Sequence, residues 1–195
     1  MLSYNESLKI LKETDALLEG HFILSSGLHS DQYIQCARLL SHPMHAESIC
    51  ASLISKIKKE FNNIDIILSP ALGGVVVGYE VARQLKLQSI FAERSNKDLV
   101  LRRGFKIPKN SNVLIVEDVI TTGKSAIECS KIVEENKAKL VGYACIIDRS
   151  DNNILIKNKI VSQLKIKIQT FNETDLPEKL KKIPAIKPGS KNLSK

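Results

Sequence analysis

The apolar residues of this chain occur in two patterns that alternate along the sequence. Short apolar runs such as "IDIILS" (64–69) have the length and the β-branched content of buried strands. Longer stretches such as "GVVVGYEVARQL" (74–85) carry apolar residues at the spacing of a helix. Because strand-like runs and helix-like stretches alternate from residue 64 to residue 148, we predict an α/β fold with a mostly parallel central sheet flanked by helices.

Each expected element can be given a residue range. Apolar runs predict four strands, at 64–69, 89–94, 112–118 and 140–148. Helical spacing, with Pro43 as a start signal, predicts helices at 43–61, 74–85 and 123–136. Nearer the N-terminus, a first helix is expected over residues 8–18 with a stop at Gly20, followed by two short strands around the turn "SSGLHSD".

Three unusual loops follow strands of this predicted sheet. They are "SPALGG" (69–74), "ERSNKDLVLRRGF" (93–105) and "EDVITTGKS" (117–125). In open α/β sheets the ligand crevice lies at the carboxyl ends of the strands. We therefore expect all three loops to open on the same side.

The positive charge of the chain is concentrated near its C-terminus. Residues 1–156 hold 19 Lys and Arg against 18 Asp and Glu, a net charge of +1, whereas residues 157–195 hold 10 against 3, a net charge of +7. We expect a single domain over residues 1–185 and a basic, solvated tail over 186–195, with contact to an acidic surface as the alternative for the tail. The main activity is not expected to involve nucleic acid.

The cysteines and the apolar runs bound the class of protein further. Four cysteines occur without a Cys-x-x-Cys spacing, so neither a disulfide framework nor a zinc site is expected. No run of about 18 apolar residues occurs, and the N-terminus is not signal-like. These features favour a cytoplasmic protein that does not contact a membrane.

The loop at residues 121–125 has the composition of a phosphate-binding site. A helix is expected to begin there, so several backbone N–H groups lack an intrahelical partner and the positive end of the helix dipole faces outward. A glycine allows close approach of a ligand, and hydroxyl groups add donors. The candidate phosphate-binding residues are Thr121, Thr122, Gly123, Lys124 and Ser125.

Glu117 and Asp118 precede this loop and cannot serve a phosphate, because like charges repel. They require hydroxyl donors or a cation, and the vicinal hydroxyls of a ribose satisfy that need. The pattern therefore predicts a ribose 5-phosphate held at both ends. The alternative is an acid that caps a strand-to-helix turn.

The segment "VLIVEDVITTGKS" (113–125) resembles the 5-phosphoribosyl 1-pyrophosphate (PRPP) motif of the type I phosphoribosyltransferases. It is not the Walker loop, because no glycine stands five residues before Gly123. The resemblance implies the fold of that family, with a small N-terminal hood formed mainly by residues 20–40 plus C-terminal segments. It also implies that Glu117 and Asp118 hold the ribose hydroxyls and that residues 121–125 hold the 5-phosphate.

Further segments between residues 20 and 151 resemble the orotate phosphoribosyltransferases within that family. This resemblance implies transfer of phosphoribose from PRPP to orotate, giving orotidine 5′-monophosphate and pyrophosphate. Mg²⁺ is the implied cofactor, held mainly by PRPP and not by direct side-chain ligands. A homodimer that shares a loop across its interface is implied, and an orotidine-monophosphate decarboxylase is a candidate partner.

Two of the loops are expected to meet the pyrophosphate group. "SPALGG" offers Ala71, Leu72 and Gly73 as a backbone cradle, with an ordinary strand-to-helix turn as the alternative. The charged segment 93–105 supplies cations that suit phosphate oxygens. Arg94 and Lys97 are the candidates for stabilising the leaving group, together with Asp118 and Glu117 at the ribose. Residues 102 and 103, both arginines, are equally well explained as strand-edge charges.

The remaining candidates would recognise the base. Arg149, after "CIID", matches the arginine that receives the orotate carboxylate in the family, and a surface arginine after a strand is the alternative. Tyr33 is placed to cover the base, with Ser25, Ser26 and Gly27 near its polar edge.

The sequence departs from the family pattern at two places. The charged loop lacks the histidine that many members carry, and a serine stands at residue 25, where lysine is frequent. Two alternative functions stay open. One is transfer to another base, either a purine or uracil, and the other is a non-catalytic regulator that senses PRPP.

Overall fold

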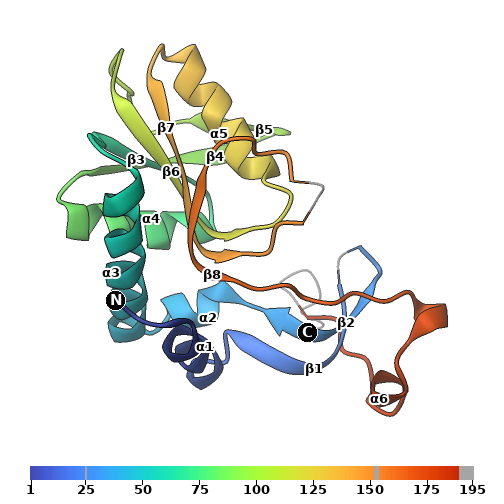
Figure 1. Ribbon diagram of the computed structural model, residues 1–195. Coiled ribbons are helices and arrows are strands. Elements are labelled where there is room, and N and C mark those ends of the chain that lie inside the picture. Colours follow the sequence, from blue (N-terminus) through green and yellow to red (C-terminus); the bar gives the residue numbers. More distant parts are fainter. Residues whose placement is uncertain (25, 152–153, 189–195) are drawn as a thin grey trace.

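A six-stranded sheet forms the centre of the computed structural model, which describes residues 1–24, 26–151 and 154–188 (Figure 1). The strands lie in the order β5-β4-β3-β6-β7-β8. All neighbouring pairs are parallel except β4 and β5, which are antiparallel. The bounds are β3 Ile66–Pro70, β4 Gln88–Ser95, β5 Asp98–Leu101, β6 Asn112–Ile120, β7 Lys139–Asp148 and β8 Ile160–Lys165. The prediction of a mostly parallel sheet is confirmed.

Helices cover both faces of this sheet. α3 (Pro43–Glu60) and α4 (Gly73–Leu85) enclose one hydrophobic core, and α5 (Lys124–Glu135) encloses the other. Strand β6 contributes to both, because successive side chains of a strand point to opposite faces. Leu114 and Val116 enter the core with α3 and α4, whereas Val113 and Ile115 enter the core with α5. This continuous apolar run is therefore a strand buried on both faces.

A second, two-stranded sheet forms a smaller layer beside the carboxyl ends of the main strands (Figure 1). It consists of β1 (Leu17–Ile23) and β2 (His29–Ile34). The C-terminal segment closes it, because Phe171 bridges to His29 and Ile186 bridges to Phe22. Residues separated by more than 140 positions in the sequence thus build one small unit.

The prediction of a first helix over residues 8–18 was wrong at its C-terminal end. Helix α1 covers Tyr4–Glu13, with a capping box at Ser3 and Glu6. It stops at Thr14, and Asp15 then adopts a positive φ of 51°. Leu17 and Leu18, which had been assigned to the helix, pair with β2 as part of β1. Cross-strand pairing decides the structure here, because the spacing of these leucines suits either element.

The segment predicted as a charged loop after residue 94 is also different in the structure. It forms a hairpin in which β5 returns antiparallel to β4, with Asn96 in the left-handed conformation at the turn. Leu99 is buried in the core with α5 and anchors the returning strand. The prediction treated the charges of this segment as decisive and missed the short apolar run Leu99, Val100 and Leu101.

Several short elements were not predicted from the sequence. They are α2 (Cys36–Leu40), strand β8, the 3₁₀ turn Glu173–Asp175 and α6 (Glu178–Lys181). All four cysteines are buried and free, in agreement with the expectation that they form no disulfide. Across the described ranges, none of the helices has the length and apolarity needed to cross a bilayer.

Candidate active site

The two adjacent acids at the end of β6 lie on opposite sides of the sheet. Asp118 continues the face of Leu114 and Val116, toward α4, whereas Glu117 continues the face of Val113 and Ile115, toward α5. The contacts described below agree with this division. The two carboxylates thus do not form one bidentate group, and each has its own surroundings.

Asp118 lies against the first residue of α4. A Cβ atom added to Gly73 would stand only 2.7 Å from Asp118 Cγ. The lack of a side chain at Gly73 lets the Asp118 carboxylate lie against the start of α4, so the loop at 69–74 and the acid at 118 are close together. Burial raises the pKa of Asp118, while hydrogen bonds from backbone N–H groups of residues 118 and 119 oppose the rise.

Glu117 is the more strongly perturbed acid. Burial and the neighbouring charge of Asp118 raise the pKa of Glu117 to about 8. Among the described residues neither acid forms an ion pair with Lys or Arg. Two half-buried carboxyl groups without a cation are suited to a ligand that brings hydroxyl donors or positive charge.

The loop after β6 leads directly into α5. Gly123 is the N-cap of this helix, with a φ of 77°, and its neighbours Thr121, Thr122 and Lys124 are exposed. The N–H groups of the first turn point outward from the helix end, as a phosphate site requires. The structure therefore places all five predicted phosphate-binding residues at a helix start.

The segment that contains Leu155 and Ile156 packs against this loop, and the sequence analysis did not predict this contact. The Leu155 N–H donates to the Thr122 carbonyl at 2.9 Å. Ile156 is buried, and a Cβ atom on Gly123 would stand 2.7 Å from its Cγ1. Ile156 thus holds the loop in position, and the only signal in the sequence was a short apolar run, "ILI", after a polar turn.

The charged hairpin presents its cations in a different manner. Arg94 is exposed and forms an ion pair with Glu128 of α5, and it also donates to the Lys97 carbonyl at 2.6 Å. Lys97 is exposed at the turn. Among the described residues, Arg94 therefore forms an ion pair with Glu128 of α5 and with neither Glu117 nor Asp118. Glu128 was missed because it lies outside the motif, although a position four residues after Lys124 shares its helix face.

The arginines at 102 and 103 differ in their contacts. Arg103 makes two hydrogen bonds to Glu93, at 2.8 and 2.7 Å, and lies 5.8 Å from the centre of the Phe91 ring. Arg102 is exposed. Of the two explanations left open for Arg103, the contacts fit a strand-edge charge.

Arg149 and Tyr33 approach each other from different layers. Arg149 follows β7, and its backbone N–H donates to the Ile120 carbonyl at 2.8 Å. Burial lowers the pKa of Arg149, and the nearby Tyr33 of β2 opposes this effect. In the described part of the chain no carboxylate pairs with Arg149. A half-buried guanidinium without an acid is available for an anionic ligand.

The turn between β1 and β2 carries the other predicted base contacts. Gly27 has a φ of 84°, and both it and Ser26 are exposed. Ser25 lies outside the described residues. The roles predicted for this turn stay predictions.

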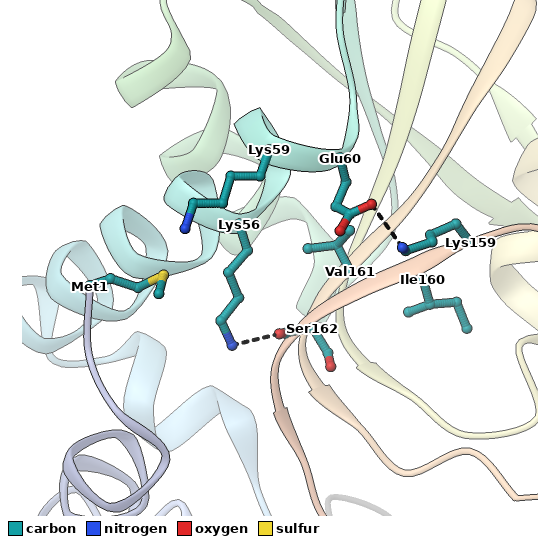
Figure 2. Close-up of a pocket in the computed structure, with 8 residues that line it drawn as sticks. All are labelled: Met1, Lys56, Lys59, Glu60, Lys159, Ile160, Val161 and Ser162. Atoms are coloured by element: carbon teal, nitrogen blue, oxygen red, sulfur yellow. Dashed lines mark hydrogen bonds and ion pairs between the residues drawn. The ribbon is translucent and has the colours of Figure 1, made fainter.

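A cavity of about 320 Å³ lies elsewhere, between the end of α3 and the start of β8. Figure 2 shows Lys56 directed at the Ser162 carbonyl, and Lys159 paired with Glu60 at 2.7 Å. This cavity contains none of the predicted site residues. It also lies at the amino end of a strand, whereas ligands of parallel sheets bind at the carboxyl ends. The β6–α5 junction is therefore the candidate active site.

Comparison with known proteins identifies the relatives of this chain. A family model described as the phosphoribosyl transferase domain matches residues 38–179. The orotate phosphoribosyltransferase of Caldicellulosiruptor saccharolyticus is 46% identical over 186 residues, covering 95% of this chain and 96% of that protein.

Solved structures share the fold at lower identity. Orotate phosphoribosyltransferase from Aeropyrum pernix has a TM-score of 0.70 and 22% identity, covering 81% of this chain and 92% of that one. Adenine phosphoribosyltransferase from Saccharomyces cerevisiae has a TM-score of 0.63 and 19% identity, covering 80% of this chain and 99% of that one. Since enzymes for two different bases share the fold, the fold alone does not select the base.

Proposed function

The chain belongs to the phosphoribosyl transferase family, and from that premise we propose that it transfers the 5-phosphoribosyl group of PRPP to orotate. The products are orotidine 5′-monophosphate and pyrophosphate. This is the activity named for its curated relatives, and it is a step of pyrimidine synthesis. A cytoplasmic location is part of this proposal.

Arg149 is the observation that carries the choice of base. It is half-buried, lacks an acidic partner among the described residues and lies near Tyr33 of the small sheet. A bidentate contact with a carboxylate requires such a guanidinium, and each charge-assisted hydrogen bond contributes about 1.5–3 kcal/mol. Orotate carries that carboxylate, whereas adenine, hypoxanthine and uracil do not.

The remaining residues bind and orient PRPP. The loop 121–125 receives the 5-phosphate, and the acids at 117 and 118 accept hydrogen bonds from the ribose hydroxyls. The backbone of Gly73 lies against the Asp118 carboxylate, and the N–H groups of this loop would receive the pyrophosphate. Fixing both ends of the sugar in this way aligns its anomeric carbon with the incoming base.

Charge stabilisation accounts for the chemical step in this proposal. The bond from the anomeric carbon to pyrophosphate oxygen breaks as a ring nitrogen of orotate forms the new bond, so positive charge develops on the ribose ring. Asp118 lies where a negative charge favours that cation, and Arg94 and Lys97 are the cations for the departing pyrophosphate.

Magnesium fits the donor set of this site. The two acids offer hard oxygen atoms without a cationic partner, and PRPP supplies further oxygen ligands. When bound, Mg²⁺ neutralises charge on the pyrophosphate. We place it mainly on PRPP, with no side chain as an obligatory ligand.

We also propose a homodimer in which the β4–β5 hairpin of one protomer reaches the site of its partner. An exposed apolar stripe supports this arrangement: Leu72, Val76 and Tyr79 follow each other at helical spacing and are 84%, 49% and 63% exposed. The stripe starts in the loop beside Asp118, so a second copy bound there would lie at the site. An orotidine-monophosphate decarboxylase remains a candidate partner of the basic tail.

The test is a PRPP-dependent assay with Mg²⁺ that compares orotate, adenine, hypoxanthine and uracil. We expect pyrophosphate to be released with orotate and with none of the other three bases. Arg149→Gln is expected to raise KM for orotate by about 10- to 100-fold and to leave KM for PRPP unchanged. Turnover with another base, or tight PRPP binding with no pyrophosphate released by any base, would refute the proposal.

A further inference from the structure

Arg94 is held by two contacts that join different parts of the molecule. It donates to the carbonyl of Lys97 at the turn of the hairpin, and it forms an ion pair with Glu128 of α5. Glu128 is 34 positions further along the chain. A single guanidinium therefore ties the β4–β5 hairpin to the helix that begins at the phosphate loop.

Glu128 lies four residues after Lys124, one turn into the helix that begins at the proposed phosphate loop. Cys129 is buried on α5, and burial raises the pKa of its thiol. Glu117 and Glu128 raise that pKa further, whereas Arg94 lowers it. The pKa of one buried thiol therefore responds to the charges of all three groups.

A cavity of about 270 Å³ separates the hairpin from α5 at this point. It is lined by Asp98, Leu99, Glu128, Lys131, Ile132 and Glu135. Three carboxylates face it against one ammonium group, which attracts a cationic side chain toward the helix. The Glu128 side chain is 19% exposed and that of Arg94 is 43% exposed, so the guanidinium is the partner with access to solvent and to other anions.

We propose that Glu128 is a positioning residue that competes with the pyrophosphate group of PRPP for Arg94, an inference that rests on the proposed function. When Arg94 pairs with Glu128, it is directed toward α5. When a pyrophosphate group is bound, Arg94 exchanges one anionic partner for another. The competition weakens binding of pyrophosphate and thereby favours its release after transfer.

Glu128→Gln tests the competition, because glutamine keeps the size of the side chain and removes its charge. We expect the Kd for magnesium pyrophosphate and the KM for PRPP to fall by about two- to fivefold, the range for a partly exposed ion pair, with KM for orotate unchanged. Calorimetry of pyrophosphate binding measures the first effect without reference to any base. An unchanged or weakened affinity for pyrophosphate would overturn the inference.

Two further variants separate this effect from a general change in charge. Glu135→Gln removes a carboxylate from the same helix and the same cavity, and it should leave pyrophosphate affinity unchanged. In an Arg94→Gln background, Glu128→Gln should have no effect, because the competing partner is gone. A gain in pyrophosphate affinity that persists in that background, or an equal gain in Glu135→Gln, would contradict the competition. It would show that Glu128 only repels the anion as a nearby negative charge.

Failure of this inference can be told apart from failure of the proposed function. Orotate turnover by the unaltered protein tests the function, and the pyrophosphate affinities test Glu128. If Glu128→Gln lowers the melting temperature, Glu128→Asp provides a second measurement. Its charge is kept on a shorter side chain, so we expect an affinity between those of the unaltered protein and Glu128→Gln. An affinity outside that interval would count against the competition.

Discussion

The β6–α5 junction and the β4–β5 hairpin both carry charged residues that the proposed reaction uses, but they hold them in different ways. At the junction, Glu117 and Asp118 belong to the central strand β6, which is paired with β3 on one side and β7 on the other. In the hairpin, Arg94 lies near the end of β4 and Lys97 lies at the turn before the edge strand β5, and both are exposed. The acids of the junction are held by buried packing, whereas the charged side chains of the hairpin form ion pairs that solvent can reach.

This difference matches the two tasks of the proposed reaction. The ribose and its 5-phosphate stay bound through the transfer, so the groups that grip them gain from rigid support. Pyrophosphate must leave, and exposed cations that can change partners suit a departing group. The predictions below change one region at a time, from the largest expected effect to the smallest.

The largest effect is expected for Asp118→Asn at the junction. It removes the negative charge beside the developing cation while keeping the shape of the side chain. We expect kcat to fall by about 10²- to 10³-fold, with a smaller change in KM for PRPP. Steady-state kinetics with orotate measure this, and full turnover would contradict the assigned role.

Two glycines with positive φ allow a direct comparison of the regions. Gly123→Ala would strain the backbone and also overlap Ile156, so we expect a loss of about 1–3 kcal/mol of stability and a higher KM for PRPP. Gly104→Ala, after the hairpin, has a similar φ of 75° but open space around its Cβ position. Thermal unfolding should show a smaller loss there, with KM unchanged. Equal effects would mean that Ile156 does not support the loop.

The raised pKa of Glu117 predicts a pH-dependent stability of the ligand-free protein. Because the folded pKa is about 8 and the usual value is 4.5, the stabilising effect of the bound proton is present below about pH 4.5 and is lost as the pH rises through 8. Glu117→Gln should therefore melt at a higher temperature than the unaltered protein at pH 9, with little difference at pH 4.5. A constant difference across this range would contradict the raised pKa.

The smallest effect is expected for Arg103→Gln in the hairpin. Arg103, whose side chain is 62% exposed, pairs with Glu93 of β4, and ion pairs that solvent can reach add little to stability. We expect the melting temperature to change by less than about 2 °C and kcat to stay the same. A large fall in kcat would assign Arg103 to the site and weaken the contrast between the regions.

The sequence predicted the central strands well because each is an apolar run bounded by polar residues. It also predicted the phosphate loop, since acids, hydroxyls and glycine follow one another within nine residues. The placing of α3 followed from Pro43 and the apolar spacing after it. These features depend on neighbours in the sequence.

The errors and omissions occurred where distant segments decide the structure. Leu17 and Leu18 became strand residues because β2 pairs with them, and the periodicity of the leucines carried no information about that partner. Ile156 supports the phosphate loop from 33 positions further along the chain, and Glu128 pairs with an arginine on another element. No local pattern marks such contacts.

The amino-acid sequence by itself thus determined that a buried strand ends in two acids and a turn into a helix, because strand alternation, helix starts and glycine are local properties of the backbone. Only the tertiary structure decided that the acids face different helices, that Tyr33 approaches Arg149, and that Glu128 holds Arg94. Those contacts depend on how the sheets and helices pack, and the packing is set by the burial of apolar faces that lie far apart in the chain.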